Sequence, residues 1–214
     1  MVIYYLWNFK PNEKNKMPLN SIINNKKYIN NYKIFTPKYT KYIFNNSIFR
    51  DLYEIYNIIP RWIIKTDLIR LMCIYLYGGY YLDIDCFIQK PFNKHTKQHN
   101  VILFTEKICS SVKLLGPREY KHHDNVLRIA NYCFGSTSKL HPFFKSVIDE
   151  CINRLKQLLL IEKKTKLNQE DILWVCGPDV ITTVYHKNKN KYNDIFLYDK
   201  SYVKHKCYGS WRSL

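Results

Sequence analysis

Residues 78–85 read Gly-Gly-Tyr-Tyr-Leu-Asp-Ile-Asp, and they place two carboxylates, Asp83 and Asp85, at the end of an apolar segment. Side chains alternate between the two faces of an extended strand, so we expect both carboxylates to point the same way and Ile84 to point into the sheet. Two such charges side by side repel one another unless a cation or a donor-rich ligand lies between them. The pattern therefore favours a hard divalent metal ion that carries phosphates.

The residues before this segment predict a helix over 61–77 that is apolar almost all round. Asp67 and Arg70 lie three positions apart on it, so they share one face and can touch. Because a polar pair is unusual on such a helix, we expect the pair to face a cleft, with a surface salt bridge as the alternative. Gly78 and Gly79 then supply a left-handed helix stop and a sharp turn into the strand.

The run from Thr66 to Asp85, TDLIRLMCIYLYGGYYLDID, resembles the signature of DxD-containing glycosyltransferases of family 32. That family includes the fungal initiating mannosyltransferases and is related to the glucosyltransferase domains of large clostridial toxins. Its signature is a Ser/Thr-Asp-x-x-Arg helix, then Gly-Gly, then a strand that ends in Asp-x-Asp. The resemblance implies a GT-A-type α/β fold, in which a central mixed, mostly parallel sheet is flanked by helices. We expect one domain over residues 1–214.

Shorter segments resemble the same family in the same order along the chain: Ile3–Trp7, Asn131–Gly135 with His141-Pro142, Cys176–Pro178 with Cys in place of Thr, and His205–Trp211. The resemblance implies that the ring of Trp7 stacks on the nucleotide base, although Trp is also a common core residue. It further implies that Asn131 contacts the sugar and that Ser210 and Trp211 cap the diphosphate. The Asn168–Asp171 string can contact the sugar or can equally cap a helix.

A sugar nucleotide reacts when its anomeric carbon loses the diphosphate, so an enzyme must stabilise negative charge on the leaving oxygen. By the family resemblance, Mn²⁺ or Mg²⁺ does this, with Asp85 as the direct ligand. Asp83 would hold the ribose hydroxyls and reach the metal through water, and His205 would complete the metal shell or contact phosphate. Asp67 and Arg70 would grip hydroxyls of the donor sugar. The predicted catalytic residues are Asp67, Arg70, Asp83 and Asp85.

The predicted function is transfer of a hexose from a nucleoside diphosphate sugar, a UDP-sugar or GDP-mannose, to a hydroxyl of a glycan, glycolipid or glycoprotein. Family members retain the anomeric configuration, so the resemblance implies retention. Two alternatives stay open at this point. A metal-dependent phosphodiesterase or nucleotidyltransferase also uses paired carboxylates, but it usually needs a further acidic ligand. A basic nucleic-acid-binding module would make the acidic pair incidental.

The formal net charge of the chain is +17. Lysines are spread from Lys10 to Lys206 without a dense basic block, so we expect no specific nucleic-acid binding. Loose peripheral contact with an anionic membrane surface stays open. The seven cysteines show no metal-ligand spacing, which favours reduced and mostly buried thiols. No signal peptide or transmembrane segment is visible, and a cytoplasmic location is expected.

Hydrophobic periodicity and turn residues predict alternating strands and helices. The expected strands are 2–7, 33–36, the segment after Gly78-Gly79 that ends in the acidic pair, 101–105, 131–137, 195–198 and 202–207, and the expected helices are 18–29, 42–59, 61–77, 141–160 and 178–185. This alternation indicates a sheet covered by helices. The acidic pair then lies at the carboxyl end of a strand, where open α/β sheets bind their ligands.

Overall fold

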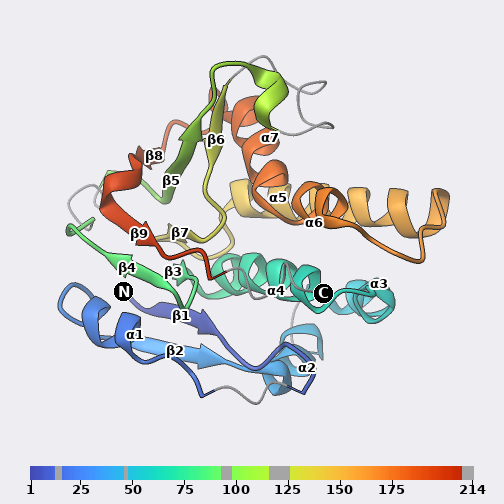
Figure 1. Ribbon diagram of the computed structural model, residues 1–214, viewed down its shortest axis with the longest axis horizontal. Coiled ribbons are helices and arrows are strands. Elements are labelled where there is room, and N and C mark those ends of the chain that lie inside the picture. Colours follow the sequence, from blue (N-terminus) through green and yellow to red (C-terminus); the bar gives the residue numbers. More distant parts are fainter. Residues whose placement is uncertain (13–15, 46–47, 93–97, 116–125, 209–214) are drawn as a thin grey trace.

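A central sheet organises the computed structural model, which describes residues 1–12, 16–45, 48–92, 98–115 and 126–208 (Figure 1). Neighbouring strands follow the order β2-β1-β3-β7-β5-β6, and β8 also pairs with β5. These strands are β1 Ile3–Leu6, β2 Tyr32–Phe35, β3 Gly79–Leu82, β5 Val101–Ile108, β6 Leu127–Ile129, β7 Cys133–Ser136 and β8 Ile195–Tyr198. A separate two-stranded ribbon consists of β4 Cys86–Ile88 and β9 Val203–His205.

Helices connect the strands and cover the sheet. They are α1 Asn20–Asn25, α2 Pro37–Asn45, α3 Tyr53–Ile58, α4 Trp62–Tyr77, α5 Pro142–Lys156, α6 Gln169–Val175 and α7 Pro178–Asn188. Short 3-10 or π-helical turns are Arg50–Leu52, Val112–Leu115, Gln157–Ile161 and Lys200–Tyr202. Of the described helices, none has the length and apolar character needed to cross a membrane.

The sheet is mixed, as predicted. Strand β1 pairs in parallel with β2 and β3, and β5 pairs in parallel with β8. The pairs β3–β7, β5–β7 and β5–β6 are antiparallel. Parallel neighbours need a crossover between them, and the helical segments that follow β1 and β2 supply it. The predicted α/β fold class is confirmed, with a parallel part at β2-β1-β3 and an antiparallel part at β7-β5-β6.

Side chains from the two faces of the sheet enter two separate hydrophobic clusters. Along β1, Tyr4 and Leu6 join the cluster that contains α4, α5 and α7. Ile3 and Tyr5 join the cluster on the opposite face, which contains residues of α1, β4 and β9. Successive side chains of β1 thus point to opposite faces of the sheet, as in any strand. Both faces are buried, which explains why all four residues have large hydrophobic or aromatic side chains.

Helix α4 is buried along most of its length and ends as the sequence predicts. Gly78 follows it at φ 67°, and Gly79 continues at φ 82°. A Cβ atom at Gly79 would lie 2.6 Å from the carbonyl oxygen of Val2, so the close approach of β1 and β3 also requires glycine here. This junction places the start of β3 beside β1. The acidic residues that follow β3 therefore come to lie at the same edge of the sheet as the end of β1.

The helix predicted over 42–59 is wrong. The structure has α2 beginning at Pro37, a 3-10 turn at Arg50–Leu52 and then α3. Proline is favoured in the first helical turn, which explains the earlier start. Ile48, which the predicted helix would have placed on its buried face, is 62% exposed. The apolar periodicity over this stretch therefore comes from two short helices rather than from one.

Candidate active site

A cavity of about 510 Å³ lies at the carboxyl ends of β1 and β3. Its wall includes every predicted site residue within the described ranges, namely Trp7, Asp67, Arg70, Asp83, Asp85, Asn131 and His205. Ligands of open α/β sheets bind in this position. Ser210 and Trp211, which were predicted to cap the diphosphate, lie outside the described residues.

The two acidic residues lie on a turn rather than on a continuing strand. Strand β3 ends at Leu82, and the backbone N–H of Cys86 donates to the carbonyl of Asp83 at 2.9 Å to close the turn. The expectation that residues 83–85 stay extended is therefore wrong, although Ile84 does pack against the hydrophobic cluster that contains residues of β4 and β9. Ile84 lines the cavity together with both carboxylates. Both acidic side chains therefore reach the cavity because a tight turn directs them there, and not because they occupy alternate positions of a strand.

Arg70 joins α4 to the acidic turn. It is buried and forms an ion pair with Asp67, as the i, i+3 spacing predicts, and its Nη1 lies 3.1 Å from Asp83 Oδ1. The hydroxyl of Tyr81 donates to the same oxygen of Asp83. Asp67 and Arg70 are only 3% and 4% exposed, so the surface-salt-bridge alternative is excluded. The pair lies in the cavity wall, as the apolar character of the helix indicates.

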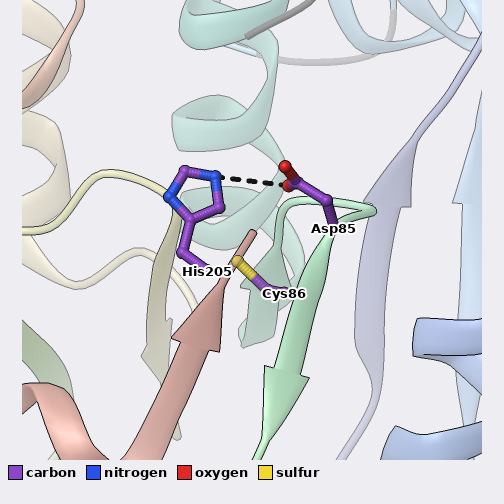
Figure 2. Close-up of side chains that lie close together, drawn as sticks. All are labelled: Asp85, Cys86 and His205. Carbon is purple, nitrogen blue, oxygen red and sulfur yellow. Dashed lines mark ion pairs between the residues drawn. The ribbon is translucent and has the colours of Figure 1, made fainter. Parts of the chain in front are cut away.

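Asp85 is held by residues far along the chain. His205 Nε2 lies 3.2 Å from Asp85 Oδ1 and 3.7 Å from Asp83 Oδ2. The backbone N–H of Tyr208 donates to Asp85 Oδ2 at 3.0 Å. Figure 2 shows the imidazole ring pointing at the carboxylate, with His205 on β9 and Asp85 just before β4. The β4–β9 ribbon pairs Cys86 with His205 and so sets this geometry.

The protonation of these groups follows from burial and from their partners. Burial raises the pKa of Asp67 to about 7, although Arg70 opposes the shift. Burial also raises the pKa of Asp83 against the pull of Arg70 and His205. For Asp85, the contacts from His205 and the Tyr208 N–H outweigh burial and lower the pKa. For His205, burial acts downward, but the carboxylates of Asp85 and Asp83 prevail and raise its pKa.

The donor set at this end of the cavity suits a divalent cation. Carboxylate oxygens of Asp85 and Asp83 and the imidazole nitrogen of His205 are ligands that Mn²⁺ accepts, and Mg²⁺ prefers the oxygens. Cys86 lies in the same group of potential ligands. Its thiol, however, donates to the carbonyl of Tyr132 at 3.6 Å, and burial raises its pKa well above the usual value. We therefore leave Cys86 out of the metal set.

Two buried donor atoms in residues of the cavity wall also point to a ligand. Arg70 Nε is buried and has no hydrogen-bond partner within the described part of the chain. Trp62 Nε1, at the other end of the cavity wall, is in the same state. Buried donors of this kind cost free energy unless something binds them. A phosphate or hydroxyl oxygen in the cavity would satisfy such donors.

Trp7 and Asn131, which are predicted to contact the nucleotide base and the sugar, both line the cavity. The backbone N–H of Trp7 donates to Phe35 at 2.9 Å, which fixes the residue directly after β1, and its half-buried side chain lines the cavity. Asn131 also lines the cavity, and its Nδ2 donates to the carbonyl of Cys176 at 3.5 Å. Contact of either side chain with a donor stays a prediction. Asn168, by contrast, forms a capping box with Asp171 at the start of α6, which confirms the helix-cap alternative.

Sequence reasoning missed several residues of the wall. They are Trp62, Tyr81, Glu106, Tyr132 and Tyr208. Tyr81 occupies a strand position that reads as ordinary core, and only its contact with Asp83 reveals its role in the site. Tyr208 acts through its backbone, for which a sequence gives no signal. Glu106 lies between Thr105 and Lys107 at the polar end of β5, where the sequence alone does not distinguish it from a solvated charge.

Comparisons with known proteins agree with this geometry. The PaToxG glycosyltransferase structure has a TM-score of 0.58 and 15% identity over 87% of this chain and 69% of that chain, so the two share a fold. Residues 12–102 match the family of glycosyltransferase sugar-binding regions containing a DXD motif. A search of curated proteins gave no match.

These findings define the class of protein as a glycosyltransferase. More particularly, Asp83-Ile84-Asp85 lies within residues 12–102, the part of the chain that matches the sugar-binding region containing a DXD motif. Membership of family 32 in particular stays a prediction. The phosphodiesterase and nucleic-acid-binding alternatives receive no support from these matches.

Proposed function

We propose that the protein transfers a hexose from a nucleoside diphosphate sugar to a hydroxyl of a glycan, glycolipid or glycoprotein, and that a divalent metal ion assists the reaction. The observation that carries this proposal is the convergence of Asp67, Arg70, Asp83, Asp85 and His205 on one cavity at the carboxyl ends of parallel strands. A UDP-sugar and GDP-mannose are the two donors that the family resemblance favours.

Each residue has a distinct role in this proposal. Asp85 and His205 hold the metal ion, with Asp83 close enough to support it directly or through water. When bound, Mn²⁺ or Mg²⁺ would neutralise charge that develops on the departing diphosphate. Asp67 and Arg70 orient the donor sugar, and the exposed part of the Trp7 ring supports the base.

The guanidinium of Arg70 has a second proposed task. Its fork contacts Asp67 and Asp83, which keeps it in one orientation, while Nε has no partner among the described residues. Burial opposes the charge, but Asp67, Tyr81 and Asp83 raise the pKa of Arg70 above its usual value, so the cation persists at any physiological pH. A fixed cation in a partly dry cavity stabilises phosphate charge without reorganisation.

Retention of the anomeric configuration is proposed from the family resemblance. In a front-face reaction, an oxygen of the departing phosphate would help to deprotonate the acceptor hydroxyl. NMR of the product tests this point, because inversion at the anomeric carbon would contradict it.

The central test compares Asp85→Asn with Asp149→Asn. Asp149 is 51% exposed in its side chain and pairs with Lys145 on α5, so it is a matched aspartate outside the cavity. Thermal-shift measurements with Mn²⁺ and UDP-glucose, UDP-galactose, UDP-N-acetylglucosamine or GDP-mannose should show stabilisation of the wild type and of Asp149→Asn. Asp85→Asn should lose that shift and at least about 100-fold of donor hydrolysis. Equal hydrolysis by all three proteins would refute the proposal.

A further inference from the structure

Glu106 lies in the cavity wall, yet none of the proposed donor contacts uses it. It belongs to β5, whose pairing with β6 changes register between Thr105 and Lys107. Thr105 pairs with Ile129 and Lys107 pairs with Arg128, so Glu106 is the extra residue of a β-bulge. Bulges occur next to active sites, where they redirect a side chain. Here the redirected side chain is a carboxylate that lines the cavity.

A buried arginine fixes this carboxylate. Glu106 Oε2 is buried 3.1 Å from Arg128 Nε, whereas the side chain as a whole keeps 32% of its surface exposed. Arg128 Nη2 lies 2.5 Å from Asp179 in the first turn of α7, and Nη1 donates to the carbonyl of Leu115 at 3.0 Å. Contacts with α7 and with the Val112–Leu115 turn thus fix the position of the Arg128 side chain, and Arg128 in turn fixes the Glu106 carboxylate.

The charge of Arg128 does not require Glu106. Asp179 already lies in contact with the guanidinium, so the carboxylate of Glu106 adds a second negative charge beside Arg128 at the cavity wall. Such a charge is unfavourable in a half-buried position unless a ligand donates hydrogen bonds to it. The Glu106 carboxylate is therefore better explained as a preorganised group that accepts hydrogen bonds from a ligand than as a structural counter-ion of Arg128.

The position of Glu106 separates it from the donor. The proposed donor contacts come from β1, α4, the turn after β3, and β9. Strand β5 is separated from β3 by β7, so their backbones lie about 10 Å apart across the sheet, while the Glu106 carboxylate is close enough to help raise the pKa of His205. The cavity continues from one part to the other past Asn131 and Tyr132. If a nucleotide sugar binds next to the parallel strands β1 and β3, the part of the cavity that contains Glu106 stays available for the acceptor.

We propose that Glu106 binds the acceptor: its carboxylate accepts hydrogen bonds from hydroxyl groups of a saccharide, and Arg128 and Asp179 are positioning residues for it. This inference rests on the proposed function, because it assumes a donor at the acidic turn. A carboxylate accepts from two neighbouring hydroxyls, an arrangement that sugars present and that most other metabolites lack. The ring of Tyr132, which lines the same cavity and packs on the ring of His205 with their centroids 4.3 Å apart, adds an apolar surface for the sugar face.

The test compares Glu106→Gln with Glu150→Gln. Glu150 is a matched control, because its Oε1 lies 2.9 Å from Arg154 Nε and its side chain is 28% exposed, but it lies on α5 and is not part of the cavity wall. Methyl α- and β-glucosides, galactosides and mannosides serve as acceptor probes. Two quantities are measured: the ratio of transfer to donor hydrolysis, and saturation-transfer NMR signals of the probes on protein loaded with UDP or GDP and Mg²⁺.

We expect Glu106→Gln to hydrolyse donor within about twofold of the wild type and to lose at least about tenfold in transfer ratio, together with the probe signal. Glu150→Gln should match the wild type in both. Unchanged transfer and probe signals in Glu106→Gln, a parallel loss of hydrolysis, or the same loss in Glu150→Gln would overturn the inference. So would a wild type that hydrolyses donor but neither binds nor modifies any probe. A wild type that hydrolyses no donor would instead refute the proposed function.

Discussion

His205 and Asp85 face one another across the start of the β4–β9 ribbon, with His205 Nε2 3.2 Å from Asp85 Oδ1. The pairing of Cys86 with His205 in that ribbon keeps the two side chains together. The backbone N–H of Tyr208 contacts the other oxygen of the carboxylate. The acidic turn thus depends on a strand that lies far from it in the sequence.

Binding of Mn²⁺ should strengthen as the pH rises. The pKa of His205 is raised above 6.5, so the imidazole is protonated at pH 6 and must lose its proton to bind a metal ion. Affinity measured by calorimetry should increase by up to about tenfold per pH unit until the pH passes that pKa. His205→Gln should bind more weakly and show a flatter profile. Equal wild-type affinities at pH 6 and pH 8 would contradict the assignment of His205 as a ligand.

The metal-free protein should show the opposite trend. A raised pKa means that the folded state holds the His205 proton more tightly than the unfolded state does. The stability from its ion pair with Asp85 is therefore complete below about pH 6.5 and is lost as the pH rises through the folded-state value. Urea unfolding in EDTA, compared between wild type and His205→Gln, measures this difference. A difference that grows with pH would have the wrong sign.

Removal of Arg70 alone should cost more than removal of the pair. Arg70→Met leaves Asp67 buried without a cation, and breaking a buried ion pair in this way costs about 3–5 kcal/mol. In the double variant Asp67→Asn/Arg70→Met, Asp67 no longer leaves a buried charge, although Asp83 still loses its contact with Arg70, so part of that loss should be recovered. Urea unfolding measures both, and the cost of Arg70→Met should grow with pH, because the pKa of Asp67 is about 7 with Arg70 present and rises further without it. Strictly additive effects would show that the two side chains do not interact.

Replacement of Trp7 should weaken donor binding with little effect on folding. Base stacking on an aromatic ring contributes about 1–3 kcal/mol, so Trp7→Leu should raise the dissociation constant for UDP or GDP with Mn²⁺ by about tenfold or more. Trp7→Phe keeps a ring and should retain most of the affinity. Calorimetry distinguishes the two. If both variants bind as the wild type does, the tryptophan has no part in nucleotide recognition.

A methyl group at Gly135 should destabilise the sheet. A Cβ there would lie 2.3 Å from Tyr80 Cδ1 and 2.8 Å from the carbonyl oxygen of Gly79, across the β3–β7 pair. Because Tyr80 is buried and backbone cannot yield, Gly135→Ala should lose about 1–3 kcal/mol or more. Asn153→Ala, at an exposed position of α5, should change little. Thermal unfolding of the two variants gives the comparison.

The sequence predicts the central part of the fold well, because α4 and β3 carry strong local signals. An apolar helix, two glycines and an apolar strand leave little choice of structure. The segment over 42–59 was predicted wrongly, since α2 and α3 are separated by a break that periodicity does not detect. Whether a short apolar period belongs to one helix or to two depends on tertiary packing, as the exposure of Ile48 shows.

The site was predictable where its side chains lie close together in the sequence. It was less predictable where the pairing of distant strands sets the direction of a side chain. The Asp67–Arg70 contact follows from helix geometry alone. The extended geometry predicted for Asp83 and Asp85 was wrong, because a turn follows Leu82. Glu106 could not be assigned from sequence, since its direction depends on a change of register between β5 and β6.

The β4–β9 ribbon has a consequence for biosynthesis. Ribosomes deliver the N-terminal segments first, and these begin to fold before later ones emerge. The acidic turn and α4 are made early, but His205 and the Tyr208 amide arrive only when β9 has left the exit tunnel. A growing polypeptide therefore lacks part of the proposed metal site until β9 has emerged from the ribosome.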